Sequence, residues 1–466
     1  MYDMMIGKRL RSWTNGWSTT QWIAVSFLAV ILVGAVLLML PVSSADGIMT
    51  APIDALFTAT TSVCVTGLVT VSTASHWSVF GKVVILLLIQ LGGFGIITVS
   101  MALLILAGRR FSMRDQIMIQ EVYSLDSMAG IRQLVIRIIA GTFLVEAIGA
   151  VGYALVYVPR FGFWKGLGCS VFNAVSAFCN AGMDIVSEDS LAPYVTDPII
   201  NITTILLIIV SGIGFLVWWD VIRVLREKKS GRIKNYKCFS RLRLHSKLAI
   251  VTTGILIAGG TVLYGLFEWN NPATLGALDG GDRLMAALFQ SVTTRTAGFY
   301  TIHQNELTDG SALLTLLLMF VGGSPMGTAG GVKTTTVAML VLTVAAVMKG
   351  RKSTEMFGRK IASESLRTAL CVVMFALSVA LVSSMLLFLT DGFEFVDTLY
   401  ETFSAVATVG LSRGITGSLS ALGKLVIIVT MYIGRTGPIT IGLLFFTDKK
   451  HHMDGMELPE SKIMIG

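Results

Sequence analysis

The sequence predicts an all-α membrane protein made of four parallel repeats, each consisting of a helix, a pore loop and a second helix. Hydrophobic residues make up 54% of the 466-residue chain and charged residues only 14%, whereas about a quarter of the residues of a soluble protein are charged. The hydrophobic residues gather in runs long enough to cross a bilayer, which takes about 20 residues. Shorter segments that resemble one another lie between alternate pairs of runs, and this repetition predicts the fourfold organisation.

Eight long apolar runs are expected to cross the membrane, at about 21–41, 79–107, 131–158, 196–225, 246–268, 311–348, 365–390 and 421–447. Four other segments, at about 51–64, 166–179, 282–295 and 395–407, are too short to span it. A re-entrant half-helix fits their length. We therefore place the repeats at 1–115, 116–230, 231–352 and 353–466, with pore segments at 51–68, 166–183, 282–299 and 395–411.

The charged residues sort the loops into two sets. Lysine and arginine gather around 8–11, 109–114, 223–247, 349–367 and 449–450, whereas aspartate and glutamate flank the pore segments. The positive-inside rule places the basic loops and both termini in the cytoplasm. It also explains the net charge of +8, so no nucleic-acid partner is expected. The basic stretch 226–245 is expected to contact a docking partner or membrane lipid.

Each pore segment carries an aromatic residue nine or ten positions before a glycine, and successive glycines are separated by 115, 116 and 112 residues. Each unit begins and ends on the same side, so the repeats are parallel and surround a pseudo-fourfold pore. Glycine adopts left-handed backbone conformations without steric cost, and rings of carbonyls replace the hydration shell of potassium in selectivity filters. We predict a filter that binds potassium at the carbonyls of Val65, Thr66, Gly67, Asn180, Ala181, Gly182, Thr296, Ala297, Gly298, Thr408, Val409 and Gly410. Arg295 is expected to be a structural tether beside this filter.

The run 311–348 is too long for a simple span, because as a helix it would measure about 57 Å. A glycine-rich break, the predicted gating loop 322–336, begins 24 residues after Gly298, which places it below the filter, where it can obstruct the pathway. Arg435 lies 25 residues after Gly410 and is expected to hold carbonyls of this loop, or else to satisfy helix ends. The predicted gating residues are Gly322, Gly323, Ser324, Pro325, Gly327, Thr328, Ala329, Gly330, Gly331, Lys333 and Arg435.

At these residues the chain resembles the Trk/Ktr/HKT superfamily of potassium transporters, and most closely the KtrB-type membrane subunits of Ktr systems. The resemblance covers nearly the whole chain and is most specific at the filter glycines, the loop Gly322–Thr336, the stretch Tyr432–Arg435 and the tail Pro459–Gly466. Gly67 is the residue found at the first filter position of the potassium-selective members, which this chain therefore resembles, whereas some sodium-selective relatives carry serine there.

The resemblance implies potassium uptake, often stimulated by sodium, across the cytoplasmic membrane of a bacterium, with the glycine-rich loop as an intramembrane gate. It implies no organic cofactor in this chain. It also implies a homodimer with one pore per protomer, seated on a KtrA-type ring of RCK subunits that binds ATP and ADP.

The sequence also bears on two other classes of function. A secondary transporter coupled to sodium or protons would normally place acidic residues within its spans, and Glu146 is the clearest such residue. A membrane enzyme or ATP-driven pump would need a nucleophile, a metal cluster or a phosphate loop. The segment Gly327–Thr334 only approximates a phosphate loop, because Val332 replaces its second glycine. The sequence thus predicts a non-enzymatic, channel-like potassium pathway.

Overall fold

The computed structural model describes residues 19–95, 98, 131–231, 238–351 and 353–437. The predicted cytoplasmic positions of both termini and the tail Pro459–Gly466 lie outside these residues. Helices dominate the described part, and the expected all-α membrane fold is confirmed. Its only described strands, β1 (Glu355–Met356) and β2 (Arg359–Lys360), form a small antiparallel hairpin.

The first repeat contains α2 (Thr19–Met39), the short α3 (Pro52–Cys64) and α4 (Val79–Phe94). Proline at the first position of α3 suits a helix start, because the amide it lacks would have no partner there. The hydroxyl of Ser78 accepts the amide of Gly81 at 3.2 Å and caps α4. Local sequence therefore fixes where both helices begin.

The second repeat contains α7 (Ile131–Phe161), α8 (Phe163–Cys179) and α9 (Pro198–Ile213). The helix α10 (Phe215–Lys229) follows α9 directly but is bent from it by 95°. The span predicted over 196–225 is therefore broken into two helices at Gly214. Gly214, with φ of 96°, supplies a backbone conformation that turns the chain sharply.

The third repeat contains α12 (Leu244–Glu268), the short α13 (Gly280–Thr293) and two successive helices, α14 (Asp309–Phe320) and α15 (Thr334–Met348). The turn of helix α11 (Cys238–Arg241) precedes α12. Residues 321–333 are not helical, so the long run 311–348 is interrupted where the glycines lie.

The fourth repeat contains α16 (Ser363–Thr390), the short α17 (Phe395–Ala407) and α18 (Ala421–Thr436). Among the described helices, Gln133–Phe161, Leu244–Glu268 and Ser363–Thr390 are long and apolar enough to cross a membrane alone, and the bent pair α9–α10 adds a fourth candidate. The apolar helices α4, α14 and α15 have 16, 12 and 15 residues and are shorter than one span, because α4 ends at a glycine-rich segment and the glycine-rich segment 321–333 separates α14 from α15.

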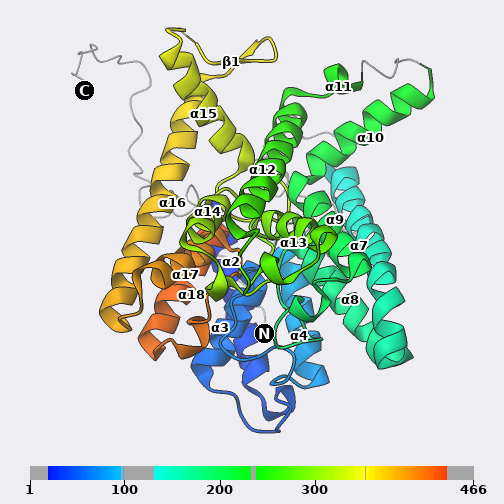
Figure 1. Ribbon diagram of the computed structural model, residues 1–466, viewed down its shortest axis with the longest axis vertical. Coiled ribbons are helices and arrows are strands. Elements are labelled where there is room, and N and C mark those ends of the chain that lie inside the picture. The colour runs from blue at the N-terminus through cyan, green and yellow to red at the C-terminus, as the bar shows by residue number, and fades with distance from the viewer. Residues whose placement is uncertain (1–18, 96–97, 99–130, 232–237, 352, 438–466) are drawn as a thin grey trace, which may run out of the picture.

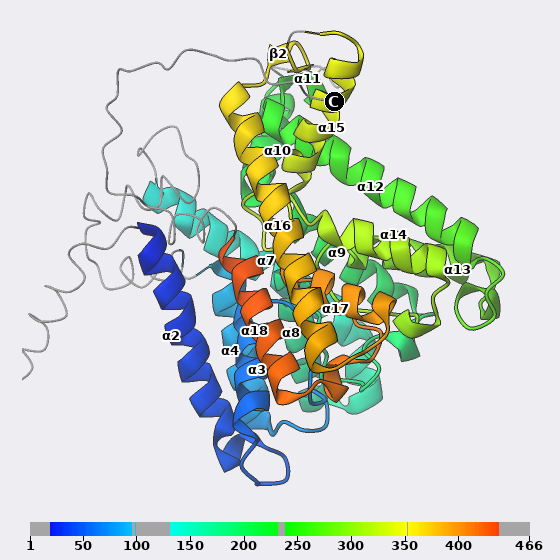
Figure 2. The same ribbon diagram turned by 90° about the vertical axis from the view of Figure 1, so that its left-hand side faces the viewer.

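The four repeats close into a ring around the short helices. In Figure 1 the first repeat lies at the lower centre, the second on the right, α12 to α14 in front and the fourth on the left, and Figure 2 shows the same bundle from the side. The second helix of each repeat packs on the short helix of the next: α4 on α8, α9 on α13, α14 on α17, and α18 on α3. The last contact joins the fourth repeat to the first and closes the ring.

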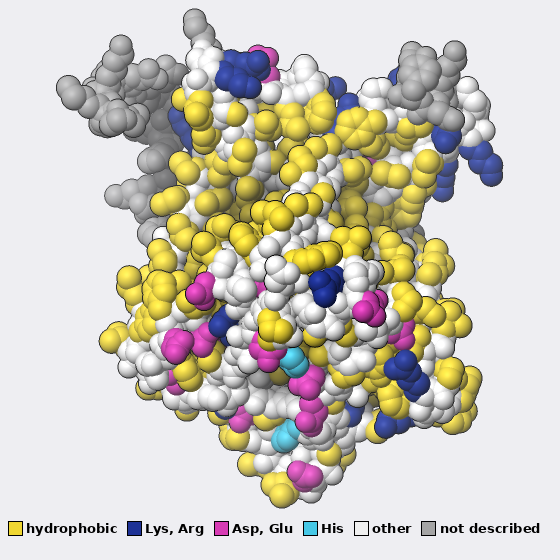
Figure 3. Space-filling view, in the orientation of Figure 1, with side chains coloured by type: hydrophobic (Ala, Val, Ile, Leu, Met, Phe, Trp, Pro, Cys, Tyr) yellow, Lys and Arg dark blue, Asp and Glu magenta, His cyan; other side chains and the backbone are white. Residues whose placement is uncertain are grey.

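The surface matches a protein in a bilayer. Large hydrophobic side chains are exposed on the outer helices, including Leu144 on α7, Ile255 on α12 and Val382 on α16, whereas the ends of the four short helices are buried. Figure 3 shows most visible aspartate and glutamate side chains in the lower half and groups of lysine and arginine at the upper end. By the positive-inside rule the upper end is cytoplasmic.

Candidate ion pathway

The four short helices end in the same backbone conformation. Val65, Asn180 and Thr408 directly follow α3, α8 and α17 with φ of 55°, 60° and 51°. Thr296, with φ of 70°, occupies the matching place two residues before its glycine, but it lies two residues further from its helix, α13. We expected only glycine at left-handed positions, so the use of these four residues is a finding that the sequence did not predict.

In each predicted filter segment, the residue before the glycine has a paired amide and an unpaired carbonyl. The residue before each filter glycine donates its amide to its own short helix: Thr66 to Thr61 O at 2.8 Å, Ala181 to Ser176 O at 2.8 Å, Ala297 to Thr293 O at 2.9 Å and Val409 to Ser404 O at 2.8 Å. Within the described parts of the chain, the carbonyl oxygens of Thr66, Ala181, Ala297 and Val409 accept no hydrogen bond. Unpaired carbonyls at membrane depth are unfavourable unless another ligand, such as a cation or water, satisfies them.

The filter glycines bring the four segments together. Gly67, Gly182, Gly298 and Gly410 have φ of 98°, 64°, 81° and 95°. A Cβ atom on any of them would clash with a carbonyl oxygen of the next repeat: on Gly67 with Ala181, on Gly182 with Ala297 at 2.7 Å, on Gly298 with Val409 and on Gly410 with Thr66. The predicted filter residues therefore meet in one closed ring, in the order of the repeats.

The segment 321–333 is held in a defined fold between α14 and α15. Gly322 donates its amide to Val332 O at 3.0 Å, and the hydroxyl groups of Ser324 and Thr334 are 2.8 Å apart. The second repeat holds the segment from the side, since the amide of Ser324 donates to Gly212 O at 2.8 Å. Gly331 adopts φ of 64°, and a Cβ on Gly327 would lie 2.6 Å from Ser211 O. Close backbone packing explains why the segment is rich in glycine.

The same segment directly contacts residues of the predicted filter. The hydroxyl of Thr328 donates to Phe178 O at 3.0 Å and accepts from Asn180 Nδ2 at 3.1 Å. The amide of Gly330 donates to Thr296 Oγ1 at 3.2 Å, and a Cβ on Gly330 would clash with Thr408 Oγ1. The segment therefore lies against filter residues of three repeats, on the side that leads to α15 and the cytoplasm.

Two cationic side chains hold the segment. Arg435, near the end of α18, donates Nη1 to Thr328 O at 2.8 Å and Nη2 to Gly92 O. Lys333 donates Nζ to Ala329 O at 2.7 Å. Arg435 therefore contacts both the loop, through Thr328, and the last turn of α4, through Gly92. In the described residues neither cation forms an ion pair with a carboxylate, so both positive charges remain uncompensated by an acidic side chain.

Arg295 lies next to the predicted filter residues of the third repeat. Its side chain is only 5% exposed, and it donates to Thr253 O on α12 at 3.4 Å and to Gly322 O at 3.2 Å. It thus connects the third short helix to the start of the glycine-rich segment.

Replacing Arg295 with glutamine is expected to destabilise the protein by about 1.5–3 kcal/mol, because hydrogen bonds from a charged group are lost and a buried carbonyl is left unpaired. The measurement is the apparent unfolding temperature in detergent micelles at one fixed scan rate. Arg367→Gln, at an exposed site on α16, is the control and should unfold as the wild type does. An unchanged unfolding temperature for Arg295→Gln would contradict the tether role.

Sequence reasoning missed that the second helices of the other repeats also stop at the depth of the loop. Gly95, Gly214 and Gly437 end α4, α9 and α18 with φ of 75°, 96° and 88°. The signal that could have revealed these ends is a small residue three positions earlier: Gly92, Ser211 and Gly434, respectively. A Cβ on Gly92 or Gly434 would clash with a carbonyl of α3 or α17, respectively, so these positions also allow the helices to approach the filter.

The ring of re-entrant helices and the loop beneath it define a pore-loop membrane protein. Its relationship to known proteins is equally clear: the chain belongs to the TrkH family of cation transport proteins, whose sequence model matches residues 15–453. It is 38% identical to the potassium/sodium uptake protein NtpJ of Enterococcus hirae, over 96% of this chain and 97% of the relative. It is 37% identical to the Ktr system potassium uptake protein B of Bacillus subtilis, over 96% of each chain.

The fold is also that of a solved transporter. The potassium transporter TrkH from Vibrio parahaemolyticus superposes with a TM-score of 0.72, covering 93% of this chain and 86% of that chain at 18% identity. The resemblance to the Trk/Ktr superfamily is confirmed, and the chain is a multi-pass protein of the cytoplasmic membrane. The family and these relatives are transport proteins rather than enzymes.

Proposed function

We propose that this chain takes up potassium through a channel-like pathway whose selectivity filter is the ring of four glycine segments. The observation that carries the proposal is the set of unpaired carbonyls that precede Gly67, Gly182, Gly298 and Gly410. Such carbonyls can replace the hydration shell of a potassium ion. The proposal agrees with the names of the relatives, which are potassium uptake proteins in Bacillus subtilis and Vibrio alginolyticus and a potassium/sodium uptake protein in Enterococcus hirae.

The second part of the proposal is that residues 321–333 form an intramembrane gate. The segment packs against filter residues and carries Lys333, while Arg435 fixes it to α4 and α18. A segment held mainly by hydrogen bonds to a few side chains can exchange between two arrangements at moderate free-energy cost. Opening then requires that the contacts of Arg435 and Thr328 be released.

The third part of the proposal concerns assembly. We expect a homodimer on a cytoplasmic KtrA-type RCK ring that responds to ATP and ADP. The support is that relatives at 37% identity are named as components of a Ktr system, and that the cytoplasmic end of the chain is rich in basic side chains.

A coupled secondary transporter is the second candidate, and Glu146 is the observation that favours it. This carboxylate is 5% exposed within α7, and Gln90 Nε2 donates to it at 3.0 Å. It has no cationic partner among the described residues. Buried acidic groups at membrane depth often take part in proton or sodium transfer. However, its contacts are with Gln90 and the thiol of Cys179, behind the filter ring.

Purified protein in proteoliposomes, with and without an RCK partner, should pass potassium down its gradient and discriminate against sodium. The measurement is isotope or dye-reported flux with potassium or sodium as the only permeant cation. Absence of passive potassium flux in both preparations would contradict the channel-like pathway. Accumulation of potassium against its gradient, driven by an imposed sodium or proton gradient, would instead support the coupled transporter.

A further inference from the structure

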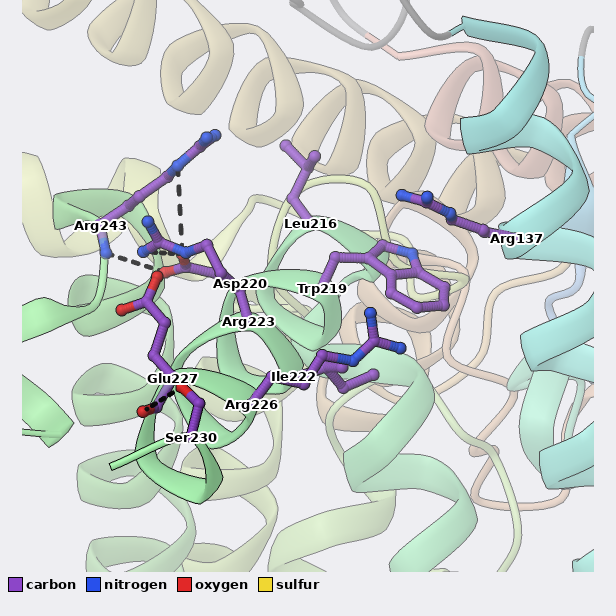
Figure 4. A pocket seen from close by; sticks show the side chains of 10 residues that line it. All are labelled: Arg137, Leu216, Trp219, Asp220, Ile222, Arg223, Arg226, Glu227, Ser230 and Arg243. Atoms are coloured by element: carbon purple, nitrogen blue, oxygen red, sulfur yellow. Dashed lines mark hydrogen bonds and ion pairs between the residues drawn. The ribbon is translucent and has the colours of Figure 1, made fainter. Parts of the chain in front are cut away.

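A cavity of about 570 Å³ opens at the cytoplasmic end of the second repeat, between α7 and α10. Four arginines contribute to its wall: Arg137 from α7, Arg223 and Arg226 from α10, and Arg243 from the start of α12 (Figure 4). The cavity is separate from the proposed pathway, because none of its lining residues belongs to the filter ring or to the segment 321–333. A concentration of guanidinium groups around one cavity indicates an anionic ligand.

Two of the arginines already have a carboxylate partner. Asp220 is buried; it accepts from Arg223 Nη2 at 2.7 Å and from the backbone amide of Arg243 at 2.8 Å. Arg137 and Arg226 are exposed, and neither pairs with an acid in the described part of the chain. Asp220 and Glu227 are the acidic residues of the wall, so the four arginines leave an excess of positive charge on the side of Arg137 and Arg226.

Trp219 provides a further donor between these two arginines. The Arg137 guanidinium lies 5.8 Å from the centroid of the indole ring, and in Figure 4 the ring lies between Arg137 and Arg226. Its Nε1 atom is buried and has no acceptor among the described residues. A buried N–H group without a partner is unfavourable, and a rotation of the indole ring toward the cavity would let an oxygen-rich anion accept its hydrogen bond.

The position of α10 identifies the source of this anion. The helix α10 is bent by 95° from the apolar α9 and lies at the upper, cytoplasmic end of the molecule in Figure 1. It carries Leu225, which is 52% exposed, together with Arg226, Lys228 and Lys229 in its last turn. Exposed apolar residues beside a basic face are typical of a helix lying at the level of lipid headgroups.

We propose that this cavity binds the phosphate group of an anionic phospholipid from the inner leaflet, with Arg137, Arg226 and Trp219 Nε1 as its donors. Arginine suits phosphate because its planar fork donates two parallel hydrogen bonds. The lipid holds α10 against α7. Since Phe215, the first residue of α10, donates its amide to Met326 O of the glycine-rich segment at 2.9 Å, the lipid site is connected to the proposed gate through one short helix.

The test is binding of phosphatidylglycerol to delipidated full-length protein in detergent, counted by native mass spectrometry, with phosphatidylcholine as the uncharged comparison. We expect wild-type protein to prefer phosphatidylglycerol, and the double variant Arg137→Gln/Arg226→Gln to bind it about 30-fold more weakly. Trp219→Phe, which keeps the ring and removes only the Nε1 donor, should weaken binding to a smaller extent. Lys360→Gln/Arg367→Gln removes the same charge from another exposed cytoplasmic region and should bind as the wild type does.

Three outcomes would overturn the proposal. The first is equal binding of phosphatidylglycerol by wild type and Arg137→Gln/Arg226→Gln. The second is an equal loss of binding in Lys360→Gln/Arg367→Gln, which would mean that the lipid is attracted by the total charge of the protein and not by a specific site. The third is displacement of the lipid by millimolar inorganic phosphate, which would identify a site for a soluble anion. Both altered arginines are exposed, so the variants should fold, and Trp219→Phe gives an independent result if the double variant does not.

Discussion

Replacing Arg435 with alanine should raise potassium flux through reconstituted protein by about ten- to a hundredfold. The guanidinium holds Thr328 O at 2.8 Å, and a hydrogen bond from a charged donor contributes about 1.5–3 kcal/mol. If that contact exists only while the loop obstructs the pathway, its loss shifts the equilibrium toward the open arrangement. The equilibrium constant between the two arrangements changes about tenfold for each 1.4 kcal/mol. Removal of a positive charge from the pathway acts in the same direction. Deleting residues 322–331 should also raise flux.

The matched control for this prediction is Tyr432→Phe. Tyr432 lies on the same helix and donates its hydroxyl to Ala24 O on α2 at 2.7 Å, so the substitution removes a hydrogen bond from α18 that does not involve the loop. We expect its flux to equal that of the wild type. If a well-folded Arg435→Ala protein passes potassium at the wild-type rate or more slowly, the loop does not obstruct the pathway in the manner proposed.

The sequence could predict the filter glycines because their physical requirement is local. A left-handed residue close to a neighbouring backbone almost excludes any side chain, so a glycine recurring at the same place in four segments is readable from spacing alone. Val65 and Thr408 could not be predicted in this way, since β-branched residues disfavour positive φ. Their conformation depends on the hydrogen bonds of the next amide, from Thr66 to Thr61 O and from Val409 to Ser404 O.

The sequence could predict the depth of Arg435 in the membrane, but it could not predict which residues of other helices lie beside it. The spacing from Gly410 placed Arg435 at the level of the glycine-rich loop, and the structure brings it to Thr328. Its second acceptor, Gly92, is 343 residues away in the sequence and comes next to it only because α18 packs on the first repeat. The bend between α9 and α10 escaped prediction for a different reason: the apolar run continues through Gly214, and hydropathy alone does not register a change of direction.

Replacing Gly410 with alanine should abolish most discrimination between potassium and sodium. Gly410 has φ of 95°, and a Cβ atom there would clash with Thr66 O and lie 2.9 Å from Gly67 Cα. Both neighbours are backbone atoms of the first filter segment, so no flexible side chain can move aside. The carbonyl ring must open on one side, and a displaced carbonyl no longer replaces the hydration shell of the ion. We expect the ratio of potassium to sodium flux to fall on the order of tenfold or more.

Gly414→Ala separates this effect from backbone strain. Gly414 has φ of 98°, nearly the same as Gly410, but a Cβ atom there has no neighbour within 4 Å. Both substitutions therefore carry the same cost of about 1–2 kcal/mol for an alanine at positive φ, while only Gly410→Ala disturbs another repeat. Selectivity should survive in Gly414→Ala and fail in Gly410→Ala. If both variants keep the wild-type flux ratio, the closed contact between the fourth and first repeats does not determine selectivity. If both variants lose selectivity equally, backbone strain in the outer loop explains the loss of selectivity, and displacement of the carbonyl ring is not needed to explain it.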